Sequence, residues 1–168
     1  ALTVALIRAS EWLRHGWLVL YLFGASPAVC RAFFSSREKL AQQFERFDDD
    51  TLYKPYATSL RMSDIGYKNN TQAGLRISFN NLAEYVDSLG RAIATPNPDY
   101  QRIGVQVNGA YRQLNANRLQ IENEYYNSVR PKQIIQSGEK PTLALKRRGI
   151  RYVELRSVDL TPFQPSAI

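Results

Sequence analysis

A carboxylate and a guanidinium stand two positions apart in Gly149–Asp159, a strand-like run near the end of the chain. Side chains of a strand alternate between its two faces, so Glu154 and Arg156 are predicted to lie on one face, about 7 Å apart at ~3.3 Å per residue. Val153 and Leu155 are predicted to lie on the other face, where they can pack against a core. Opposite charges at this spacing are typical of a solvated surface pair. They also suit a site in which the carboxylate binds a divalent cation and the arginine binds phosphate oxygens, and spacing alone leaves both interpretations open.

Few other residues offer catalytic chemistry. The chain has no glycine-rich phosphate loop of the GxxxxGK[ST] type, and its single histidine and single cysteine argue against zinc clusters and Cys/His nucleophile pairs. His15 falls in an amphipathic pattern and is interpreted as structural or exposed. The run Asp48–Asp50 is interpreted as a solvated loop, because consecutive carboxylates rarely converge on one ion. Function must therefore come from carboxylates, arginines and tyrosines.

The composition is that of a folded protein with a basic surface. Of the 168 residues, 44% are hydrophobic and 11% aromatic, which excludes a disordered chain and supplies one core. The formal charge of +7 is compatible with nucleic acid or with an anionic ligand. Its densest cluster, Lys146–Arg148, is either a solvated face or an anion-facing patch. With Cys30 as the single cysteine, no intramolecular disulfide can form; this fits a reducing compartment, and we expect a cytoplasmic protein.

The sequence carries no signal for a membrane or for secretion. No run reaches ~18 apolar residues, the length a transmembrane helix needs. Charged residues interrupt the apolar N-terminal pattern, which argues against a signal peptide. The chain begins within a helical pattern without methionine and stops after a proline-containing tail, so we expect a central part of a longer protein.

The periodicity predicts helices and strands in alternation within one partial domain, residues 1–168. Apolar residues at helical spacing predict a helix over residues 2–23. A second helix is predicted after a cap at Asn80 or Asn81, and a short third helix begins at Pro141. The dipeptide Asn108-Gly109 predicts a hairpin turn. Further strands are predicted over residues 119–126 and in the final run that holds Glu154.

Five blocks of the sequence resemble the proteobacterial glutamate–cysteine ligases, also called γ-glutamylcysteine synthetases. The blocks are Tyr21–Ala28, Pro55–Tyr67, Leu119–Tyr126 with Arg130–Lys132, Ser137–Glu139 and Gly149–Asp159. They follow in the family's order at similar spacing, and the resemblance extends from Trp17 to the C-terminus. It implies an α+β fold, with a curved and largely antiparallel sheet and helices on its outer side, as in the glutamine synthetase and glutamate–cysteine ligase group.

The resemblance also implies a reaction. With ATP and Mg²⁺, such an enzyme phosphorylates the γ-carboxylate of L-glutamate, and the amine of L-cysteine then displaces phosphate from the acyl phosphate. This is the first step of glutathione biosynthesis. Carboxylates suit the hard cation, and arginines suit the charge that spreads over a transferring phosphoryl group.

The resemblance assigns roles to five residues. Glu154 falls on a metal ligand, and Arg156 falls on the catalytic arginine that contacts glutamate and the phosphoryl group. Arg61 falls on an arginine that binds a substrate carboxylate, while Tyr67 and Tyr126 fall on tyrosines that line the cysteine site. From the residues alone, Arg61 also fits a surface arginine, and the two tyrosines also fit core aromatics.

Two more carboxylates, Glu122 and Glu124, are predicted on the same strand face as Tyr126, where they would assist at the site. The remaining metal ligands and part of the glutamate site are expected N-terminal to this chain, so we expect it to be inactive alone. Its expected partners are L-glutamate, L-cysteine, ATP and the missing parts of the same enzyme, with no nucleic acid and no membrane. Two alternatives are a basic RNA-binding module and a related ligase with another amine acceptor.

Overall fold

The computed structural model describes residues 2–63, 65, 66, 72 and 74–160. They fall into two compact units, one made of Ala1–Leu13 and Asn69–Arg156, the other of Arg14–Lys68 and Ser157–Ile168. The first is called the strand-pair unit below, and the second the loop unit. Helix α1, Leu2–Phe23, runs through the boundary between them.

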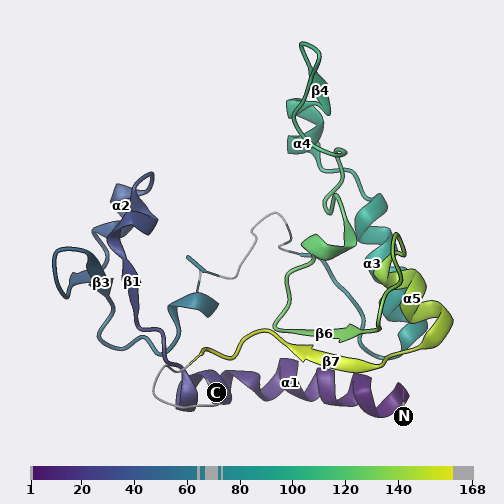
Figure 1. Cartoon of the computed structure of the whole chain (residues 1–168), viewed down its shortest axis with the longest axis horizontal. Helices are drawn as coiled ribbons and strands as arrows, with labels where there is room; N and C mark the ends of the chain where they lie inside the picture. The colour runs from purple at the N-terminus through teal and green to yellow at the C-terminus, as the bar shows by residue number, and fades with distance from the viewer. Residues whose placement is uncertain (1, 64, 67–71, 73, 161–168) are drawn as a thin grey trace. The chain divides into compact units, whose positions relative to one another are not determined.

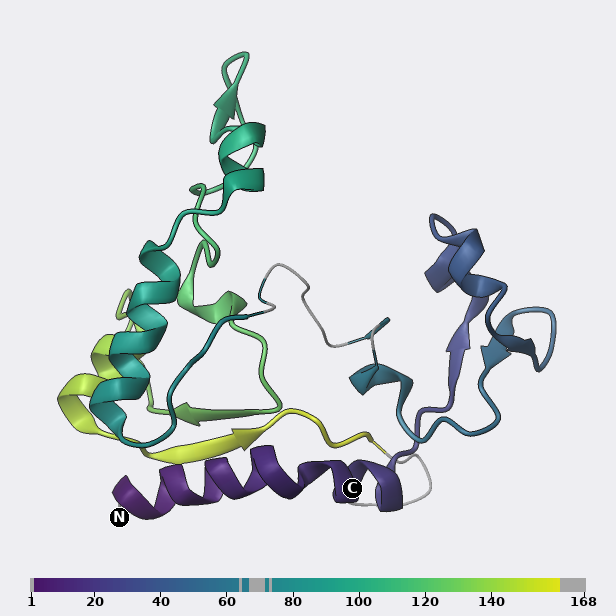
Figure 2. The ribbon, with the colours of Figure 1, turned by 180° about the vertical axis from the view of Figure 1, so that it is seen from behind.

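The strand-pair unit contains three further α-helices, a hairpin and one strand pair (Figure 1). After α1, its elements in chain order are α3 (Leu82–Ala94), α4 (Pro98–Ile103), β4 (Gln106–Val107), β5 (Ala110–Tyr111), the 3-10 turn η4 (Glu122–Glu124), β6 (Val129–Lys132), α5 (Pro141–Arg148) and β7 (Tyr152–Leu155). Figure 2 shows the same elements from behind, with the first part of α1 running along β7.

Helix α3 begins where the capping chemistry of the sequence predicts. Asn81 is the N-cap, and its side-chain oxygen accepts a hydrogen bond from the backbone N–H of Glu84 at 2.9 Å. The Glu84 carboxylate in turn accepts hydrogen bonds from Ser78, Asn80 and Asn81, which lower its pKa. The Asn81 side chain thereby satisfies one of the backbone donors that the first turn of a helix leaves unpaired, and the Glu84 carboxylate holds the capping side chain in place.

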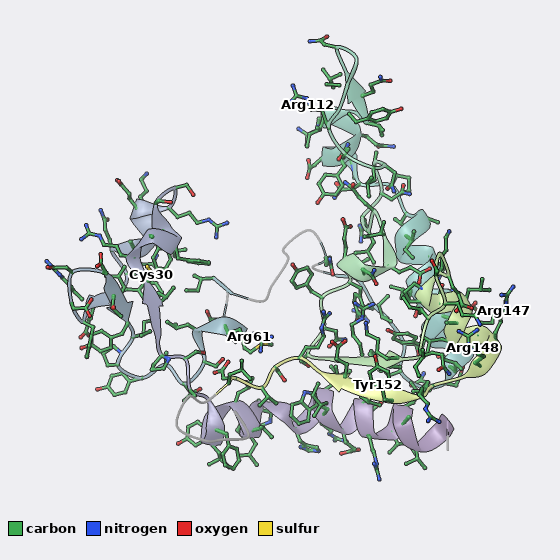
Figure 3. All side chains as sticks on the ribbon, viewed as in Figure 1. Cys30, Arg61, Arg112, Arg147, Arg148 and Tyr152 are labelled. Carbon is green, nitrogen blue, oxygen red and sulfur yellow. The ribbon has the colours of Figure 1, made fainter. Side chains whose placement is uncertain are left out.

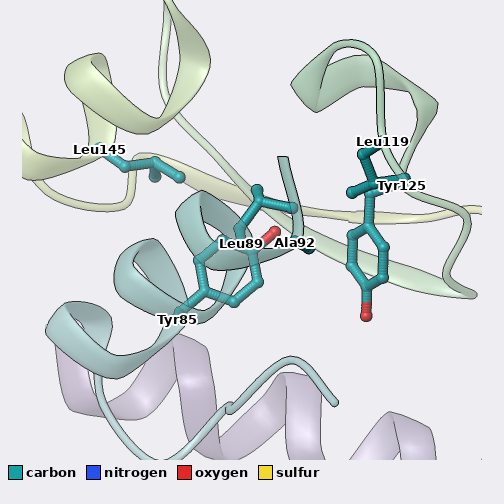
Figure 4. Packing of buried hydrophobic residues seen from close by; sticks show 6 residues of the cluster. All are labelled: Tyr85, Leu89, Ala92, Leu119, Tyr125 and Leu145. Carbon is teal, nitrogen blue, oxygen red and sulfur yellow. The ribbon is translucent and has the colours of Figure 1, made fainter. Parts of the chain in front are cut away.

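The apolar face of α3 builds the core of the strand-pair unit (Figure 4). The buried cluster consists of Tyr85, Leu89, Ala92, Leu119, Tyr125 and Leu145. Phe79 packs on Tyr85 with its ring centroid 5.2 Å away, in the edge-to-face geometry that aromatic pairs favour. Burial raises the pKa of Tyr85 to about 12. This core joins α3, α5 and the segment around η4 into one support for the strand pair.

Strands β6 and β7 pair antiparallel in a register that decides which side chains meet. The opposed residues are Val129 and Leu155, Arg130 and Glu154, Pro131 and Val153, and Lys132 and Tyr152. Opposed residues of an antiparallel pair share a face. The polar face therefore carries Arg130, Lys132, Tyr152 and Glu154, and we call it the charged face.

The loop unit contains a three-stranded antiparallel sheet in the order β1-β3-β2 and several short helical turns. Its elements after α1 are β1 (Ala28–Cys30), the 3-10 turn η1 (Arg31–Phe34), α2 (Glu38–Ala41), β2 (Glu45–Arg46), β3 (Thr51–Tyr53) and the 3-10 turn η2 (Leu60–Met62). Phe34 is buried and packs against Phe44 with the ring centroids 5.0 Å apart.

Most elements confirm the sequence-based predictions. The helices at residues 2–23, after Asn81 and from Pro141 are present, as is the final strand. The hairpin turn has φ of 51° at Asn108 and 79° at Gly109, the positive values that favour this dipeptide. Every strand pair of the described sheets is antiparallel, so the α+β class is confirmed, with sheets that are small and open. None of the helices in the described ranges combines the length and apolar character that crossing a bilayer requires.

The strand predicted over residues 119–126 is wrong. The segment holds the η4 turn between irregular stretches. Its backbone groups are bonded by side chains rather than by a partner strand: Glu124 accepts from the N–H of Gln120 at 2.7 Å, and Asn115 donates to the Gln120 carbonyl at 2.9 Å. Such local side-chain bonds compete with a strand ladder for the same groups.

Candidate active site

Glu154, on β7, and Arg156, just beyond its end, lie on the same side of the chain, as their spacing predicts. The backbone N–H of Arg156 donates to the Ser128 carbonyl at 2.8 Å, so the pairing with the β6 side continues one residue beyond β7. The Nε atom of Arg156 lies 3.6 Å from Oε2 of Glu154. Taken by itself, this contact fits the interpretation of a surface ion pair. The residues of β6 form the rest of its surroundings.

Strand β6 adds a second cation to the Glu154 carboxylate. Lys132 lies diagonally across the strand pair, and its Nζ is 3.4 Å from the same oxygen, Oε2. That oxygen is shielded from solvent and accepts no hydrogen bond from the described part of the chain. The oxygen therefore has two cationic neighbours but no hydrogen bond among the described residues.

Arg130 is the buried residue that pairs with Glu154 across the two strands. It is 3% exposed, and its guanidinium donates to the carbonyls of Glu122 at 3.2 Å and Asn123 at 3.4 Å. Its Nε has no partner among the described residues. Neither Arg130 nor Lys132 was assigned to the site from sequence, although their alternation in Arg130-Pro131-Lys132 is the period-two signal that placed Glu154 and Arg156 together.

Glu122 and Glu124 lie in the turn η4 rather than on a strand, so the prediction that they share a strand face with Tyr126 is wrong. Both carboxylate oxygens of Glu122 are bound to Thr142, one to the backbone N–H at 2.7 Å and one to the hydroxyl at 2.5 Å. Thr142 lies in the first turn of α5, whose capping residue Lys140 makes no side-chain cap bond. Glu122 therefore supplies the acceptor and the negative charge that a helix N-terminus favours.

Tyr126 is held at the surface of the strand-pair unit by a buried glutamine. Its side chain is 42% exposed, whereas the neighbouring Tyr125 fills the core. The Gln72 amide accepts from the N–H of Tyr126 at 2.8 Å and donates to the carbonyl of Glu124 at 2.5 Å. The core-aromatic interpretation thus applies to Tyr125, and Tyr126 has the exposure that a ligand-contacting residue needs.

Arg61 lies in the loop unit, in the middle of the turn η2, and is labelled in Figure 3. Its guanidinium donates to the carbonyl of Val158 at 2.8 Å. The structure therefore brings Glu154 and Arg156 together, places Tyr126 in the same unit as that pair, and places Arg61 in the loop unit. Tyr67 lies outside the described residues.

Within the basic cluster Lys146–Arg148, Arg148 has a structural role. Arg148 makes a bidentate ion pair with Glu139, at 2.9 and 2.5 Å, and also donates to the carbonyl of Ile134 at 2.9 Å. The pairing lowers the pKa of Glu139 to about 2, chiefly through the Arg148 hydrogen bond and then through the backbone N–H of Gln136. Arg148 therefore holds the loop after β6 against α5.

Two cavities bear on ligand binding. A cavity of about 110 Å³ borders the charged face and is lined by Arg130, Lys132 and Tyr152 together with Tyr85 and Thr142. A cavity of about 790 Å³ lies in the loop unit between η1, α2 and β3 and contains none of the predicted site residues. In the described residues, no three His, Cys, Asp or Glu side chains are grouped as a metal site. Glu154 can thus contribute one ligand to a cation.

Comparison with protein families gives one matching model. The model described as glutamate-cysteine ligase matches residues 2–168. Among curated proteins, the glutamate–cysteine ligase of Alcanivorax borkumensis is 57% identical over 160 residues, covering 92% of this chain and 30% of that protein. The enzyme of the same name from Pseudomonas paraeruginosa is 54% identical over 165 residues, covering 98% of this chain and 30% of that protein. The chain thus spans under a third of these relatives' length.

The solved structures that share the fold include two enzymes of glutathione synthesis by name. The glutamate–cysteine ligase of Francisella tularensis, in complex with AMP, superposes with a TM-score of 0.85 at 41% identity, covering 99% of this chain and 33% of that one. A bifunctional glutathione synthetase from Pasteurella multocida superposes with a TM-score of 0.60 at 26% identity, covering 99% of this chain and 16% of that one.

Proposed function

The chain belongs to the glutamate–cysteine ligase family, and from this premise we propose that it forms part of an ATP-dependent ligase that joins the γ-carboxylate of L-glutamate to the amine of L-cysteine. The observation that carries the proposal is the Glu154 carboxylate between Lys132 and Arg156 on one face of the strand pair. Carboxylate and cations side by side are what a metal-bound phosphate needs.

Glu154 is the proposed Mg²⁺ ligand of this segment. Its Oε2 accepts no hydrogen bond from the described residues, and a carboxylate oxygen is the donor type that Mg²⁺ prefers. One carboxylate does not make a complete site, so the other ligands must come from outside the described residues. When bound, the ion would neutralise phosphate charge.

Arg156 is the proposed catalytic residue. A planar guanidinium can donate two parallel hydrogen bonds to phosphoryl or carboxylate oxygens. Placed beside the metal ligand, it would meet the charge that spreads over the phosphoryl group as this leaves ATP for the γ-carboxylate of glutamate. Lys132 adds a second positive charge on the same face and would hold a phosphate oxygen.

Arg61, Tyr67 and Tyr126 are the proposed amino-acid contacts. Arg61 would pair with a substrate carboxylate, and the two tyrosines would line the site of L-cysteine, whose amine attacks the acyl phosphate. The exposure of Tyr126 and the clamp on its backbone by Gln72 support this role. The cytoplasm is the proposed compartment, because the cysteine substrate must remain a free thiol.

The proposal is tested in a full-length host. This sequence replaces the matching segment of the Pseudomonas paraeruginosa enzyme, and the product is called the hybrid ligase below. We expect phosphate release that requires ATP, L-glutamate and L-cysteine together, with γ-glutamylcysteine as product. A folded hybrid that releases no phosphate would contradict the proposal, and one that prefers another amine would correct the acceptor.

A further inference from the structure

Two distant segments of the loop unit donate hydrogen bonds to the buried carboxylate of a third. Asp159 is 6% exposed, and its Oδ2 accepts hydrogen bonds from the backbone N–H of Ala25 at 3.0 Å and from the Ser26 hydroxyl at 2.8 Å. Its Oδ1 accepts from the Ser59 hydroxyl at 3.1 Å. A buried carboxylate is stable only when such donors replace water, so Asp159 fixes the segments that supply them.

The backbone around Asp159 reinforces this convergence. Ser26 forms a parallel bridge with Ser59: its N–H donates to the Thr58 carbonyl at 3.1 Å, and its carbonyl accepts from Leu60 at 2.8 Å. Gly24 makes the approach possible, because a Cβ at this position would overlap the Thr58 carbonyl. The segment that carries Ser59 is therefore held tightly at the start of η2.

The same C-terminal segment also binds Arg61 directly. Ser59 lies two residues before Arg61, and the Arg61 guanidinium donates to the carbonyl of Val158, the residue before Asp159. The turn η2 is thus bonded twice to the segment Val158-Asp159, once through the Ser59 hydroxyl and once through the Arg61 guanidinium. Loss of the Asp159 bonds would remove the Ser59 bond and leave the Val158 carbonyl, which makes the other bond, in a segment that is no longer held by its neighbour Asp159.

We propose that Asp159 is a positioning residue that holds Arg61 in the orientation for binding a substrate carboxylate. The proposal rests on the role of Arg61 under the proposed function. Asp159 itself touches no substrate in this account. It acts through Ser59 and through the carbonyl of Val158. These contacts restrict the rotamers of the Arg61 side chain before substrate binds, so less side-chain entropy is lost on binding.

The test is a double-mutant cycle in the hybrid ligase. Asp159→Asn keeps the shape but replaces an acceptor by an NH₂ donor that faces the donors of Ala25 and Ser26 or of Ser59. Arg61→Ala identifies the amino-acid substrate whose binding depends on Arg61. We expect Asp159→Asn to raise the KM of that same substrate on the order of 10-fold and to leave the KM of ATP unchanged. In the Arg61→Ala background, Asp159→Asn should then add less than about 2-fold. Asp99→Asn, at an exposed carboxylate paired with Arg102, is the control and should change neither KM.

The outcomes separate the inference from the proposed function. An inactive hybrid without substitutions contradicts the function. An Arg61→Ala enzyme with unaltered KM values contradicts the role of Arg61 and overturns the inference with it. An active hybrid in which Asp159→Asn acts equally with and without Arg61, or raises the KM of ATP as much, overturns the inference alone. If Asp159→Asn fails to fold, the double variant Ser26→Ala with Ser59→Ala removes two of the donors, and the same cycle applies.

Discussion

Lys132 reaches across the strand pair from β6 and places its Nζ 3.4 Å from Oε2 of Glu154 on β7. The two residues are diagonal neighbours in the register that opposes Arg130 to Glu154. This contact gives the proposed metal ligand a cationic neighbour from each strand. The predictions below refer to the hybrid ligase.

Replacing Lys132 by methionine should weaken the binding of ATP. The substitution keeps the length of the side chain and removes the charge that we place against a phosphate oxygen. We expect the KM of ATP to rise on the order of 10-fold, with a smaller change in the KM of L-glutamate. Initial rates at varied ATP measure this effect. Lys146→Met, on the exposed side of α5, is the control, and equal effects of the two variants would count against the role of Lys132.

Replacing Glu154 by glutamine should raise the Mg²⁺ concentration needed for half-maximal activity. The amide keeps the shape of the side chain but is a weaker ligand without charge. Activity is titrated with Mg²⁺ at fixed ATP, with Glu38→Gln as a control at an exposed position of α2. An unchanged Mg²⁺ dependence would show that Glu154 is a structural partner of Lys132 and Arg156.

Replacing Gln72 by leucine should impair the use of L-cysteine. Leucine leaves the N–H of Tyr126 and the carbonyl of Glu124 without their partners, at a cost of about 1–3 kcal/mol in stability. The freed backbone would misplace Tyr126, so we expect the KM of L-cysteine to rise about 5-fold or more while the KM of ATP is unaffected. Gln101→Leu, at an exposed site in α4, should change neither KM. A loss of stability without any change in the KM of L-cysteine would make Gln72 a purely structural residue. It would also argue against a role of Tyr126 in the L-cysteine site.

The Glu139–Arg148 pair should contribute a pH-dependent part of the stability. The pKa of Glu139 falls from 4.5 to about 2 in the folded chain, so its contribution is complete above 4.5 and is lost as the pH falls towards 2. Glu139→Gln should therefore lower the urea midpoint at about pH 6 and lower it less at about pH 3. The midpoints of the two proteins are compared at both pH values. A constant difference would show that the ion pair contributes nothing that titrates in this range.

The sequence predicts local geometry well and long-range contacts poorly. Period two placed Glu154 beside Arg156, and Asn81 and Asn108-Gly109 marked a helix start and a turn, because the physical cause in each case lies within a few residues. The contact of Lys132 with Glu154 depends on a strand register that neither strand reveals alone. The Asp159 bond to Ala25 spans 134 positions, and no local pattern indicates it.

The failure at residues 119–126 has the same origin. Alternating residues predict a strand, but the side chain of Glu124 binds the backbone of its own segment, and Glu122 caps α5 from twenty positions away. Whether these side chains or a partner strand bind the backbone groups depends on residues distant in the sequence, such as Thr142, and the local pattern does not contain them. The family resemblance supplied the proposed roles of Arg61 and Tyr126, which spacing could not.

The rate of acyl-phosphate formation in Arg156→Ala tests the central claim most directly. In rapid-quench experiments with ATP, Mg²⁺ and L-glutamate, we expect ADP formation to slow on the order of 10²-fold, because Arg156 is proposed to meet charge in the transition state. ATP affinity should change far less, and Arg156→Lys should recover only part of the rate, since an ammonium cannot donate two parallel hydrogen bonds. Rates of ADP formation equal to those of the unsubstituted hybrid in both variants would contradict the claim and make the Glu154–Arg156 pair a structural feature of β7.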